Sequence, residues 1–451
     1  MPRSEQFMQS TRENLAKFIQ RLEEEGKKEN KNHAALFFAP HHHLRNGDAE
    51  YPYRQSSDIL YLTGWEDPDM ALLIRPHSEK KVIMFVQAKD PKMEIWTGIR
   101  PGIEGAKTCF GADDAFHFSD LKKQLPNLLL GIDVLHYRFA ENADMDGLLL
   151  SSIATGRKVG KGNGMSVPEI FCDPALILHR QRLVKTESEL NIIRKAAQIT
   201  AKAHQAAMKM TKAGVFEYQL DAKISYIFRS EGGNGPGYTT IVGGGANAVI
   251  LHYITNDAPL KEGELVCVDA GCEYEYYTAD VTRAWPVNGT FSEAQKEIYL
   301  AVLEAEDKAI QAVKPGVRFM DIHHVAVRSL TESMVNLGIL SGEIESLIAD
   351  KAYRKYYMHG TSHWLGMDVH DVGPYVAEKE SIPLEVGMLF TIEPGLYFGA
   401  DDESVPEKYR GIGIRIEDDI LVTENGHENL TLMIPKKIED IEAIVGKDAC
   451  S

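Results

Sequence analysis

The segment GELVCVDAG at residues 263–271 decides the fold, because it returns later in the chain as GMLFTIEPG at residues 387–395. In each copy a glycine leads into a short apolar run that ends in a carboxylate, Asp269 or Glu393, and a second glycine closes the segment. Short apolar runs between turn residues are typical of buried strands. Two copies are too few for a solenoid. We therefore expect one domain of two similar halves, each bringing a strand-end carboxylate to a shared centre.

Two capping boxes predict helices in the same part of the chain. Thr186 with Glu189, and Ser292 with Gln295, have the spacing at which the two side chains satisfy backbone N–H groups of the first helical turn. After Thr186, apolar residues recur every three or four positions as far as Met210, which is the period of a helix that packs on one face. We expect one helix to begin after Thr186 and another after Ser292.

The length of 451 residues exceeds what one ordinary core fills, so two domains are expected. Residues 1–174 are predicted to form an N-terminal α/β domain and residues 175–451 the catalytic domain, which makes the fold class α/β (α+β). The Gly- and Pro-rich segment 159–174 is the predicted linker. In the N-terminal part a helix is predicted at 13–25, and strand-like apolar runs lie at 34–39, 59–62, 70–74, 82–87 and 128–134.

The chain contains 49 basic and 66 acidic residues, which gives a formal net charge of −17. Nucleic-acid binding needs a basic face, so we expect no nucleic-acid partner. The N-terminus has no apolar run typical of a signal peptide, no apolar stretch is long enough to span a membrane, and no Cys-x-x-Cys pair occurs. We expect a cytoplasmic protein without a membrane partner.

Asp280 provides a second carboxylate near Asp269. The residues after Asp269 resemble a hairpin turn, and residues 277–287 are the predicted return strand. With a four-residue loop at 273–276, Asp269 and Asp280 would lie directly opposite each other, with Cβ atoms about 4.5–5.5 Å apart. Like charges at this distance repel, and a divalent cation between them is one stabilising solution. A register error of one residue would put the two side chains on opposite faces.

The second half supplies its own pair of carboxylates, Glu393 and Glu417, and an imidazole, His363, lies between the two halves. Each residue alone has a plainer interpretation, as a strand-end cap, a solvated edge or a structural histidine. Together, four carboxylates and one imidazole form a hard, oxygen-rich set of ligands that suits Mn²⁺-like ions. Two such ions about 3.5–4 Å apart can share a hydroxide and act as Lewis acids.

The order and context of these five residues resemble the metal ligands of the pita-bread metallopeptidases, which include methionine aminopeptidase, prolidase and aminopeptidase P. The resemblance covers nearly the whole chain and is closest to the aminopeptidase P family. It implies a C-terminal pita-bread domain with a pseudo-two-fold internal repeat. It rests on YPYRQSSD at 51–58, YLTG at 61–64, HGTSHWLG at 359–366 and DVHDVG at 368–373.

The resemblance implies that the chain binds two divalent metal ions, with Mn²⁺ as the expected metal. Asp280 and Glu417 would bridge both ions, Asp269 would bind one ion, and His363 with Glu393 would bind the other. A hydroxide that bridges the metals would attack the bond between an N-terminal residue and proline, and Glu393 would carry a proton to the leaving nitrogen. The implied enzyme is an Xaa-Pro aminopeptidase whose substrates are peptides with proline at the second position.

The resemblance also implies roles for residues around the metals. His252 and His370 would hydrogen-bond the scissile carbonyl or the oxyanion during catalysis. His359 would help to form the pocket for the proline ring. Arg415 and Tyr397 would orient the substrate or the ligands near the metals.

Trp96 lies in the segment EIWTGIRPG at 94–102, which resembles a segment of the family. We expect a homo-oligomer, a dimer or a tetramer, in which Trp96 of one subunit borders the active site of another and contacts the substrate. The alternative is that Trp96 only caps the core of its own domain.

Two other functions compete with the aminopeptidase. A prolidase, which cleaves only Xaa-Pro dipeptides, would share all five ligands. Some pita-bread domains are non-catalytic interaction modules, but such proteins usually lack ligands that this chain retains.

Overall fold

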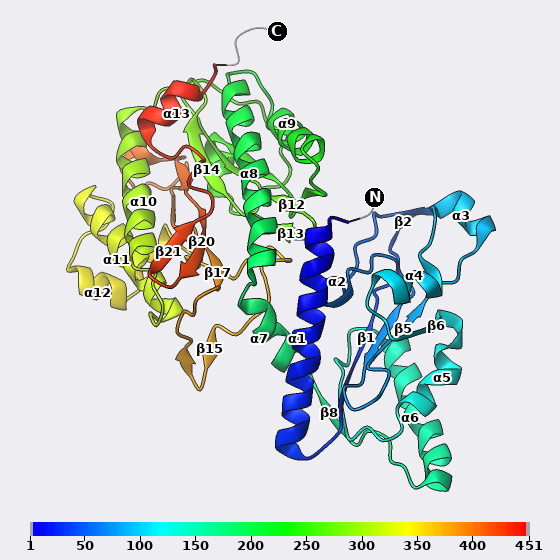
Figure 1. Cartoon of the computed structure of the whole chain (residues 1–451). Helices are drawn as coiled ribbons and strands as arrows, with labels where there is room; N and C mark the ends of the chain where they lie inside the picture. Colours follow the sequence, from blue (N-terminus) through cyan, green and yellow to red (C-terminus); the bar gives the residue numbers. More distant parts are fainter. Residues whose placement is uncertain (1–2, 448–451) are drawn as a thin grey trace. The chain divides into compact units, whose positions relative to one another are not determined.

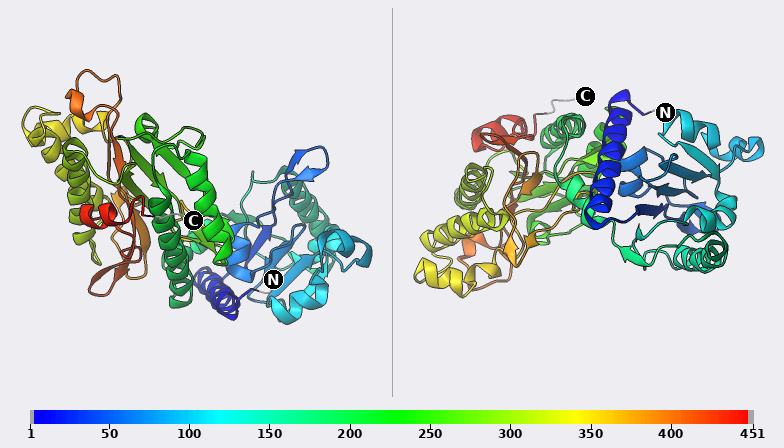
Figure 2. Two further views of the ribbon diagram at one scale, coloured as in Figure 1. Left: turned by 90° about the horizontal axis from the view of Figure 1, so that it is seen from above. Right: turned by 60° about the horizontal axis from the view of Figure 1, so that its bottom comes forward.

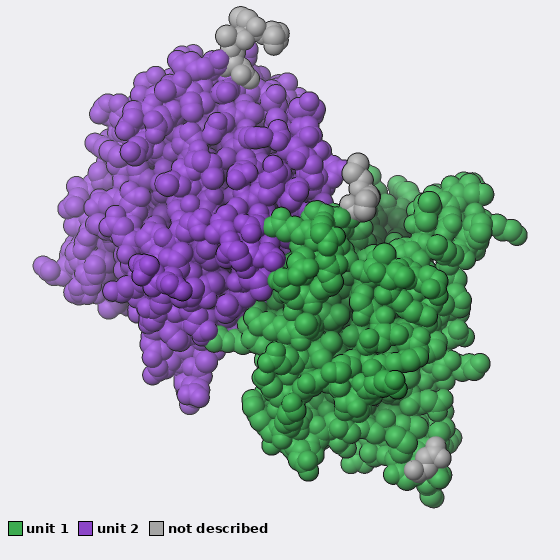
Figure 3. Space-filling view, viewed as in Figure 1, with its two compact units in different colours: residues 1–181 green, residues 182–451 purple. Residues whose placement is uncertain are grey.

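The computed structural model describes residues 3–447, apart from the side chain of Asn163. The chain divides into two compact units, Met1–Gln181 and Arg182–Ser451 (Figure 3). The first unit ends inside helix α7 (Ala175–Leu183), whereas the boundary predicted after residue 174 lies just before that helix. Both units contain helices and strands, so the predicted α/β (α+β) fold class is confirmed.

Unit 1 is built on a mixed six-stranded sheet in the order β6-β5-β4-β1-β7-β8 (Figure 1). β1 pairs antiparallel with β4 and parallel with β7. The central strands are buried on both faces, which explains their uninterrupted apolar runs. The strands are β1 (His33–Phe38), β4 (Ala71–Ile74), β5 (Val82–Val86), β6 (Asp114–His117), β7 (Val134–His136) and β8 (Ile170–Cys172), with a separate hairpin of β2 (Leu44–Asn46) and β3 (Ala49–Glu50).

Helices cover both faces of this sheet. On one face Leu36 packs in a cluster with Leu125 of α5 and Ile153 of α6. On the other face Phe37 meets Phe18 of α1 with a ring-centroid distance of 6.0 Å. Successive side chains of a strand point to opposite faces, so neighbouring residues of β1 serve the two layers. The helices are α1 (Glu5–Glu29), α2 (Ser57–Thr63), α3 (Pro91–Thr97), α4 (Gly102–Cys109), α5 (Leu121–Leu128) and α6 (Ala143–Asn163).

The strand predicted at residues 59–62 is wrong, because these residues lie in α2. Ser56 caps this helix by accepting a hydrogen bond from the backbone of Ile59 at 3.2 Å, and Gly64 ends it in the left-handed conformation. Every residue of the helix except Asp58 is buried, so the apolar run 59–62 continues around the helix. In a short run of consecutive apolar residues, the spacing of the apolar side chains cannot distinguish a helix from a strand.

The linker predicted at residues 159–174 is also wrong, because this segment belongs to the fold of unit 1. Helix α6 continues to Asn163, and β8 then pairs in parallel with β7. The apolar run at 128–134 is no single strand, since it covers the end of α5 and only the first residue of β7. Glycines within α6 hid the helix from the sequence analysis.

Unit 2 contains two similar halves, so the internal repeat is confirmed. In each half a pair of helices flanks the strands (Figures 1 and 2). Both predicted capping boxes are present, with Thr186 and Ser292 as the N-caps. The first half comprises α8 (Glu187–Met210), α9 (Glu217–Ser230), β9 (Gly235–Pro236), β10 (Ile241–Gly244), β11 (Leu265–Asp269), β12 (Cys272–Tyr274), β13 (Tyr277–Thr278) and β14 (Thr282–Pro286).

The second half repeats this plan and ends in one further helix. Its strand β17 corresponds to β11 and pairs antiparallel with β20, as β11 pairs with β14. Ile224 of α9, Val268 of β11 and Val302 of α10 belong to one buried cluster, so the halves share a core. The elements are α10 (Glu293–Gln311), α11 (Phe319–Asn336), α12 (Ile344–Ala349), β15 (Val376–Ala377), β16 (Glu380–Ser381), β17 (Leu389–Ile392), β18 (Gly395–Tyr397), β19 (Gly413–Arg415), β20 (Asp418–Thr423), β21 (Gly426–Asn429) and α13 (Ile438–Ile444).

The hairpin register in the first half differs from the predicted one. Asp269 pairs with Thr282 and not with Asp280. The turn contains two residues rather than four, since Glu275 and Tyr276 adopt positive φ angles of 48° and 65°. A two-residue turn of this type requires positive φ at both positions. The resulting register shift of two residues leaves both aspartates on the same face, so the predicted convergence survives.

In the second half the two glutamates lie opposite each other. Ile392 pairs with Asp418 between β17 and β20, and the same register continues between β18 and β19. Glu393 and Glu417 occupy the positions between these two ladders. Across the described range, residues 3–447, the structure has no helix with both the length and the apolar character needed to cross a membrane.

Candidate metal centre

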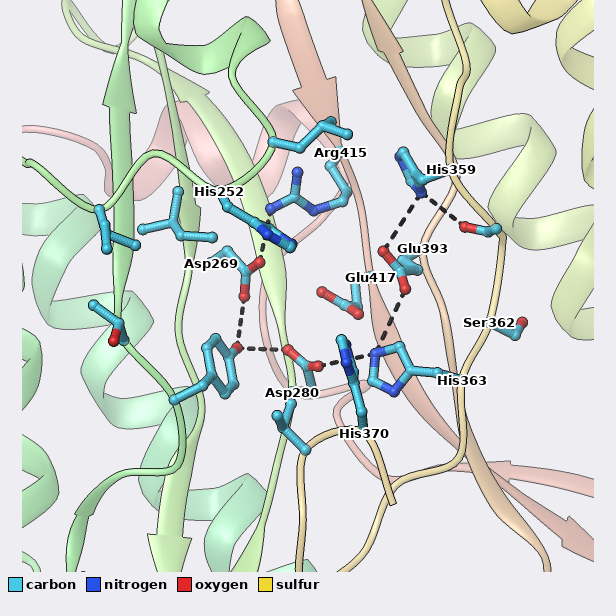
Figure 4. Close-up of a pocket in the computed structure, with 17 residues that line it drawn as sticks. His252, Asp269, Asp280, His359, Ser362, His363, His370, Glu393, Arg415 and Glu417 are labelled. Atoms are coloured by element: carbon cyan, nitrogen blue, oxygen red, sulfur yellow. Dashed lines mark hydrogen bonds and ion pairs between the residues drawn. The ribbon is translucent and has the colours of Figure 1, made fainter. Parts of the chain in front are cut away.

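A cavity of about 530 Å³ lies in unit 2 and is lined by residues of both halves (Figure 4). β11 ends in Asp269, and Asp280 precedes β14. Glu393 follows β17 and Glu417 precedes β20. The cavity is lined by all five predicted metal ligands and also by His252, His359, His370 and Arg415.

Three of the predicted ligands come close enough to share one ion. Asp280, His363 and Glu417 each offer a ligand atom, and these atoms lie within 4.8 Å of one another. The Nε2 atom of His363 lies 3.3 Å from Oδ2 of Asp280 and 3.5 Å from Oε1 of Glu393. The cluster therefore joins an aspartate of the first half to an imidazole and glutamates of the second.

Tyr238, which the sequence analysis missed, lies between the two aspartates. Its hydroxyl oxygen is 2.6 Å from Oδ1 of Asp269 and 2.5 Å from Oδ1 of Asp280. A hydroxyl has one hydrogen, so it can donate fully to only one of the two at a time. The residue stands in a loop after Gly-Pro-Gly, where no periodic signal marks a functional side chain.

The electrostatics of the cluster favour a cation. Burial raises the pKa of Glu393 from 4.5 to about 7, even though the charge of His363 opposes the shift. Burial and then the charge of Asp269 raise the pKa of Asp280. The pKa of Glu417 is raised well above its usual value by burial and by Asp280. Each carboxylate thus makes its neighbours harder to ionise, and a divalent ion would remove this repulsion.

His363 is oriented to offer Nε2 to the cluster. Its Nδ1 lies 3.1 Å from the carbonyl oxygen of Trp364, which fixes one hydrogen on Nδ1 and directs Nε2 to the cluster. Burial alone would lower the pKa of His363, but Asp280 and Glu393 raise it to about 9. A metal would replace that proton. The oxygen-rich donor set with one imidazole therefore fits hard divalent ions.

A hydrogen-bonded chain extends from the cluster to His359. Arg415 donates to Oδ2 of Asp269 at 2.7 Å and to the hydroxyl of Tyr397 at 3.2 Å. That hydroxyl lies 2.8 Å from Nε2 of His359. Tyr397 does not line the cavity, so it reaches the site only through these two partners. Thr282, also missed from the sequence, accepts from Arg415 at 3.0 Å and donates to Glu417 at 2.6 Å.

His359 and His370 are predominantly neutral imidazoles at neutral pH. Burial and then the charge of Arg415 lower the pKa of His359 to about 4. Burial and then the charge of His363 lower the pKa of His370. The rings of His363 and His370 meet edge to face with centroids 4.3 Å apart. Neutral imidazoles can donate a hydrogen bond or pack against an apolar ring without repelling a metal.

The segment that follows His370 is held by a buried ion pair network. Asp371 accepts from Arg182 at 2.6 Å and from Lys185 at 3.0 Å. Burial would raise the pKa of Asp371, but the charges of Arg182 and Lys185 lower it. The backbone next to His370 is therefore fixed from outside the cavity.

The model of metallopeptidase family M24 matches residues 191–424, and that of the aminopeptidase P N-terminal domain matches residues 10–136. The chain belongs to metallopeptidase family M24. The M24 match covers all the residues of the cluster, and the second match lies within unit 1. The predicted resemblance is confirmed in both parts of the chain.

Curated relatives of this metallopeptidase extend over nearly its whole length. The Xaa-Pro aminopeptidase of Escherichia coli (strain K12) is 44% identical over 414 residues, which cover 91% of this chain and 93% of the relative. The Xaa-Pro aminopeptidase of Haemophilus influenzae is 41% identical and covers 92% of this chain and 93% of its own length.

Solved structures confirm the fold of the metallopeptidase. Aminopeptidase PepP of Pseudomonas aeruginosa superposes with a TM-score of 0.92 at 42% identity, covering 95% of this chain and 97% of its own. Zn-substituted aminopeptidase P of E. coli in complex with product has a TM-score of 0.91 at 41% identity, covering 97% of this chain and 98% of its own. The second of these relatives thus holds zinc, a divalent metal.

Two predicted site residues, Tyr397 and Trp96, do not line the metallopeptidase cavity, and among the described residues Trp96 makes no hydrogen-bonded link to it such as Tyr397 makes through Arg415 and His359. Trp96 lies on α3 in unit 1, and its side chain is 81% exposed. The alternative that Trp96 caps the core of its own domain is therefore wrong. Its neighbours Ile95 and Ile99 are exposed as well.

Proposed function

We propose that this metallopeptidase removes the N-terminal residue from peptides whose second residue is proline. The proposal is carried by the meeting of Asp280, His363 and Glu417 in a cavity that His359 and His370 also line. Similarity to proteins named Xaa-Pro aminopeptidase over 91% of the chain supports the choice of bond.

Two divalent ions would be held by the carboxylates and the imidazole of the cluster, and the oxygen-rich donor set makes Mn²⁺ the expected metal. When bound, the ions supply Lewis acidity that polarises the scissile carbonyl and acidifies the attacking water. The residues that would hold them are Asp269, Asp280, His363, Glu393 and Glu417.

The remaining residues would position the substrate and move protons. His370 and His252 would donate hydrogen bonds to the carbonyl oxygen, where negative charge develops in the transition state. Glu393 would take a proton from the attacking water and deliver it to the leaving nitrogen. Both nitrogens of His359 have partners, Gly360 and Tyr397, so this ring serves as a fixed wall rather than as a proton carrier.

The leaving nitrogen of an Xaa-Pro bond belongs to a tertiary amide and carries no hydrogen. Selectivity for proline must therefore come from the shape of a wall and not from a hydrogen bond to that nitrogen. His359, held at Nε2 by Tyr397 and at Nδ1 by Gly360, supplies such a wall.

A panel of Xaa-Pro-Yaa, Xaa-Pro and Met-Ala-Yaa peptides with Mn²⁺, Co²⁺ or Zn²⁺ tests the proposal. We expect cleavage of Xaa-Pro-Yaa, with Mn²⁺ giving the highest rate. Cleavage confined to Xaa-Pro dipeptides would instead identify a prolidase. No cleavage of any peptide by a metal-loaded sample would favour a non-catalytic binding module.

Replacing His370 by Ala should lower kcat by about 10²- to 10³-fold, the usual cost of losing one donor to the oxyanion. The metal content should not change, since His370 is not one of the proposed ligands. Steady-state kinetics combined with elemental analysis would measure both quantities. His427→Ala, at a histidine on β21 outside the cavity, is the matched control. A His370→Ala enzyme that has lost both metals would show that the residue is a ligand.

We also propose that the enzyme works as a cytoplasmic homo-oligomer in which Trp96 of one subunit borders the active site of another. The exposed apolar segment of Ile95, Trp96 and Ile99 supports this proposal, since aromatic residues are favoured in interface cores. A wall from a second subunit would keep folded proteins away from the metals.

Replacing Trp96 by Ala should raise KM for longer peptides more than for tripeptides and weaken the assembly. Kinetics with peptides of increasing length and analytical ultracentrifugation would measure the two effects. Tyr226→Ala, at another exposed aromatic residue, is the control. A fully active monomer at assay concentration would refute the proposal.

A further inference from the structure

The loop that carries His252 leads from β10 towards β11, and three glycines that the proposed function does not use, 243–245, lie at the end of β10 and the start of the loop. At Gly244 an added Cβ would lie 2.6 Å from a methyl group of Leu260 and 3.4 Å from Oε1 of Glu217. At Gly245 φ is +54°, a conformation that other residues rarely adopt. The glycines therefore allow the loop to pack closely on the side chains beneath it.

Glu217, the first residue of α9, is the buried group around which this loop closes. Its carboxylate has about four acceptor positions, and each has a donor from the loop. A carboxylate is also stabilised at the N-terminus of a helix. Oε1 accepts from Gly244 N at 2.8 Å and from Asn247 Nδ2 at 3.0 Å, and Oε2 accepts from the Tyr253 hydroxyl at 2.9 Å and from Ala258 N at 2.9 Å.

These four contacts tie together the beginning, the middle and the end of the loop. The backbone N–H of Glu217 also donates to the carbonyl oxygen of Ala258 at 3.0 Å. Buried Asn256 closes the base of the loop by accepting from Val242 N at 3.0 Å and donating to Thr240 O at 2.9 Å. The segment is thus a closed structure with Glu217 at its centre.

His252 depends on this structure for its position. It lines the cavity on the side of Asp269 and Arg415 (Figure 4). It is exposed, and its ring makes no hydrogen bond to any other residue in the described part of the chain. The adjacent residue, Tyr253, is one of the four donors to Glu217. The place of the imidazole is therefore set by the backbone.

We propose that Glu217 is a positioning residue for the reaction, which holds the loop so that His252 faces the scissile carbonyl. This inference rests on the proposed function, because it needs His252 to act on the substrate. Glu217 does not line the cavity, and its carboxylate bonds to Gly244, Asn247, Tyr253 and Ala258, none of which is a proposed metal ligand. It acts on the reaction only through the loop.

The test is a double-mutant cycle of Glu217→Gln with His252→Ala. Glutamine keeps the size of the side chain but offers one acceptor oxygen in place of two. We expect Glu217→Gln to lower kcat about tenfold, with KM and metal content changed less than about twofold. In the His252→Ala background the same change should alter kcat by less than about twofold, because there is no imidazole left to position.

A role in general stability would give a different result. In that case Glu217→Gln would lower kcat by the same factor in both backgrounds, which would overturn the proposal, as would an unchanged kcat in the single variant. Glu297→Gln is the matched control, since Glu297 also accepts from a tyrosine hydroxyl but bonds to Tyr409 and Lys408, which lie outside this loop. If Glu217→Gln does not fold, Tyr253→Phe removes one donor and should show the same pattern with a loss of about threefold.

Hydrogen exchange separates failure of this inference from failure of the proposed function. Glu217→Gln should speed amide exchange in residues 243–258 and leave α8 and α10 unchanged. If the wild-type enzyme cleaves no Xaa-Pro peptide, the proposed function fails, while the exchange experiment still shows whether Glu217 holds the loop. Unchanged exchange in residues 243–258 would refute the positioning role directly.

Discussion

Replacing Asp280 by Asn, or Glu417 by Gln, is expected to lower kcat/KM by at least about 10³-fold and to remove metal from the protein. Both side chains sit where the halves of unit 2 meet. Asp280 contacts His363 of the second half, and Glu417 bonds to Thr282 of the first half through its side chain at 2.6 Å and its backbone N–H at 3.1 Å. An amide keeps the shape but loses the charge that attracts the ions.

The comparison with Asp269→Asn makes this prediction specific. Asp269 is proposed to bind one ion, so its loss should deplete one metal before the other, whereas Asp280→Asn and Glu417→Gln should deplete both together. Elemental analysis after dialysis, run beside steady-state kinetics, would measure the difference. Glu306→Gln is the control, because Glu306 is a buried carboxylate that bonds to Lys436 away from the cavity. Full occupancy by two metals in the Asp280→Asn variant would contradict the proposal that Asp280 binds both ions.

Removing the metals is expected to abolish activity and to lower the melting temperature of the protein by about 5 °C or more. A ligand that binds only the folded state at 100 times its Kd stabilises it by about 2.7 kcal/mol, and each kcal/mol shifts Tm by about 2–4 °C in a domain of this size. Calorimetry on chelated and reloaded samples would measure the shift. Full turnover by a sample shown to be metal-free would refute the metal centre.

The contribution of Glu393 to the stability of the metal-free protein is expected to fall as the pH rises. Burial raises the pKa of Glu393 from 4.5 to about 7 in the folded state, so that state binds more protons than the unfolded chain between these values. The contribution of Glu393 to stability is therefore fully present below pH 4.5 and is lost as the pH rises through 7. We expect the difference in Tm between metal-loaded and metal-free samples to widen over this range. A difference in Tm that stays constant over this range would contradict the proposed effect of Glu393.

Much of the site could be predicted because the decisive signals are local. The strand ends at Asp269 and Glu393 follow from short apolar runs beside turn residues, and the capping residue Thr186 depends on a spacing of three. The convergence of Asp269 with Asp280 survived a wrong turn length, because side chains alternate with a period of two and the error was two residues.

The features that were missed depend on tertiary context. Glu275 and Tyr276 carry no Asn-Gly signal, yet the packed strands hold them at positive φ. Tyr238 and Thr282 reach the carboxylates only when distant strands come together, so no spacing in the sequence marks them. All of helix α2 except Asp58 is buried, so its apolar residues show no amphipathic period. In each case a long-range contact decides the outcome.

The division of the ligands between two halves has a consequence for synthesis. A ribosome makes the first half before the second, and the donors Asp269 and Asp280 emerge long before Glu393 and Glu417. The backbone N–H of Glu417 bonds to Thr282 O, so the last donor is seated only when β20 folds against the first half. A nascent or prematurely terminated chain thus lacks the complete centre and cannot digest peptides around it, and the hydrolase becomes active only when its final strands are in place.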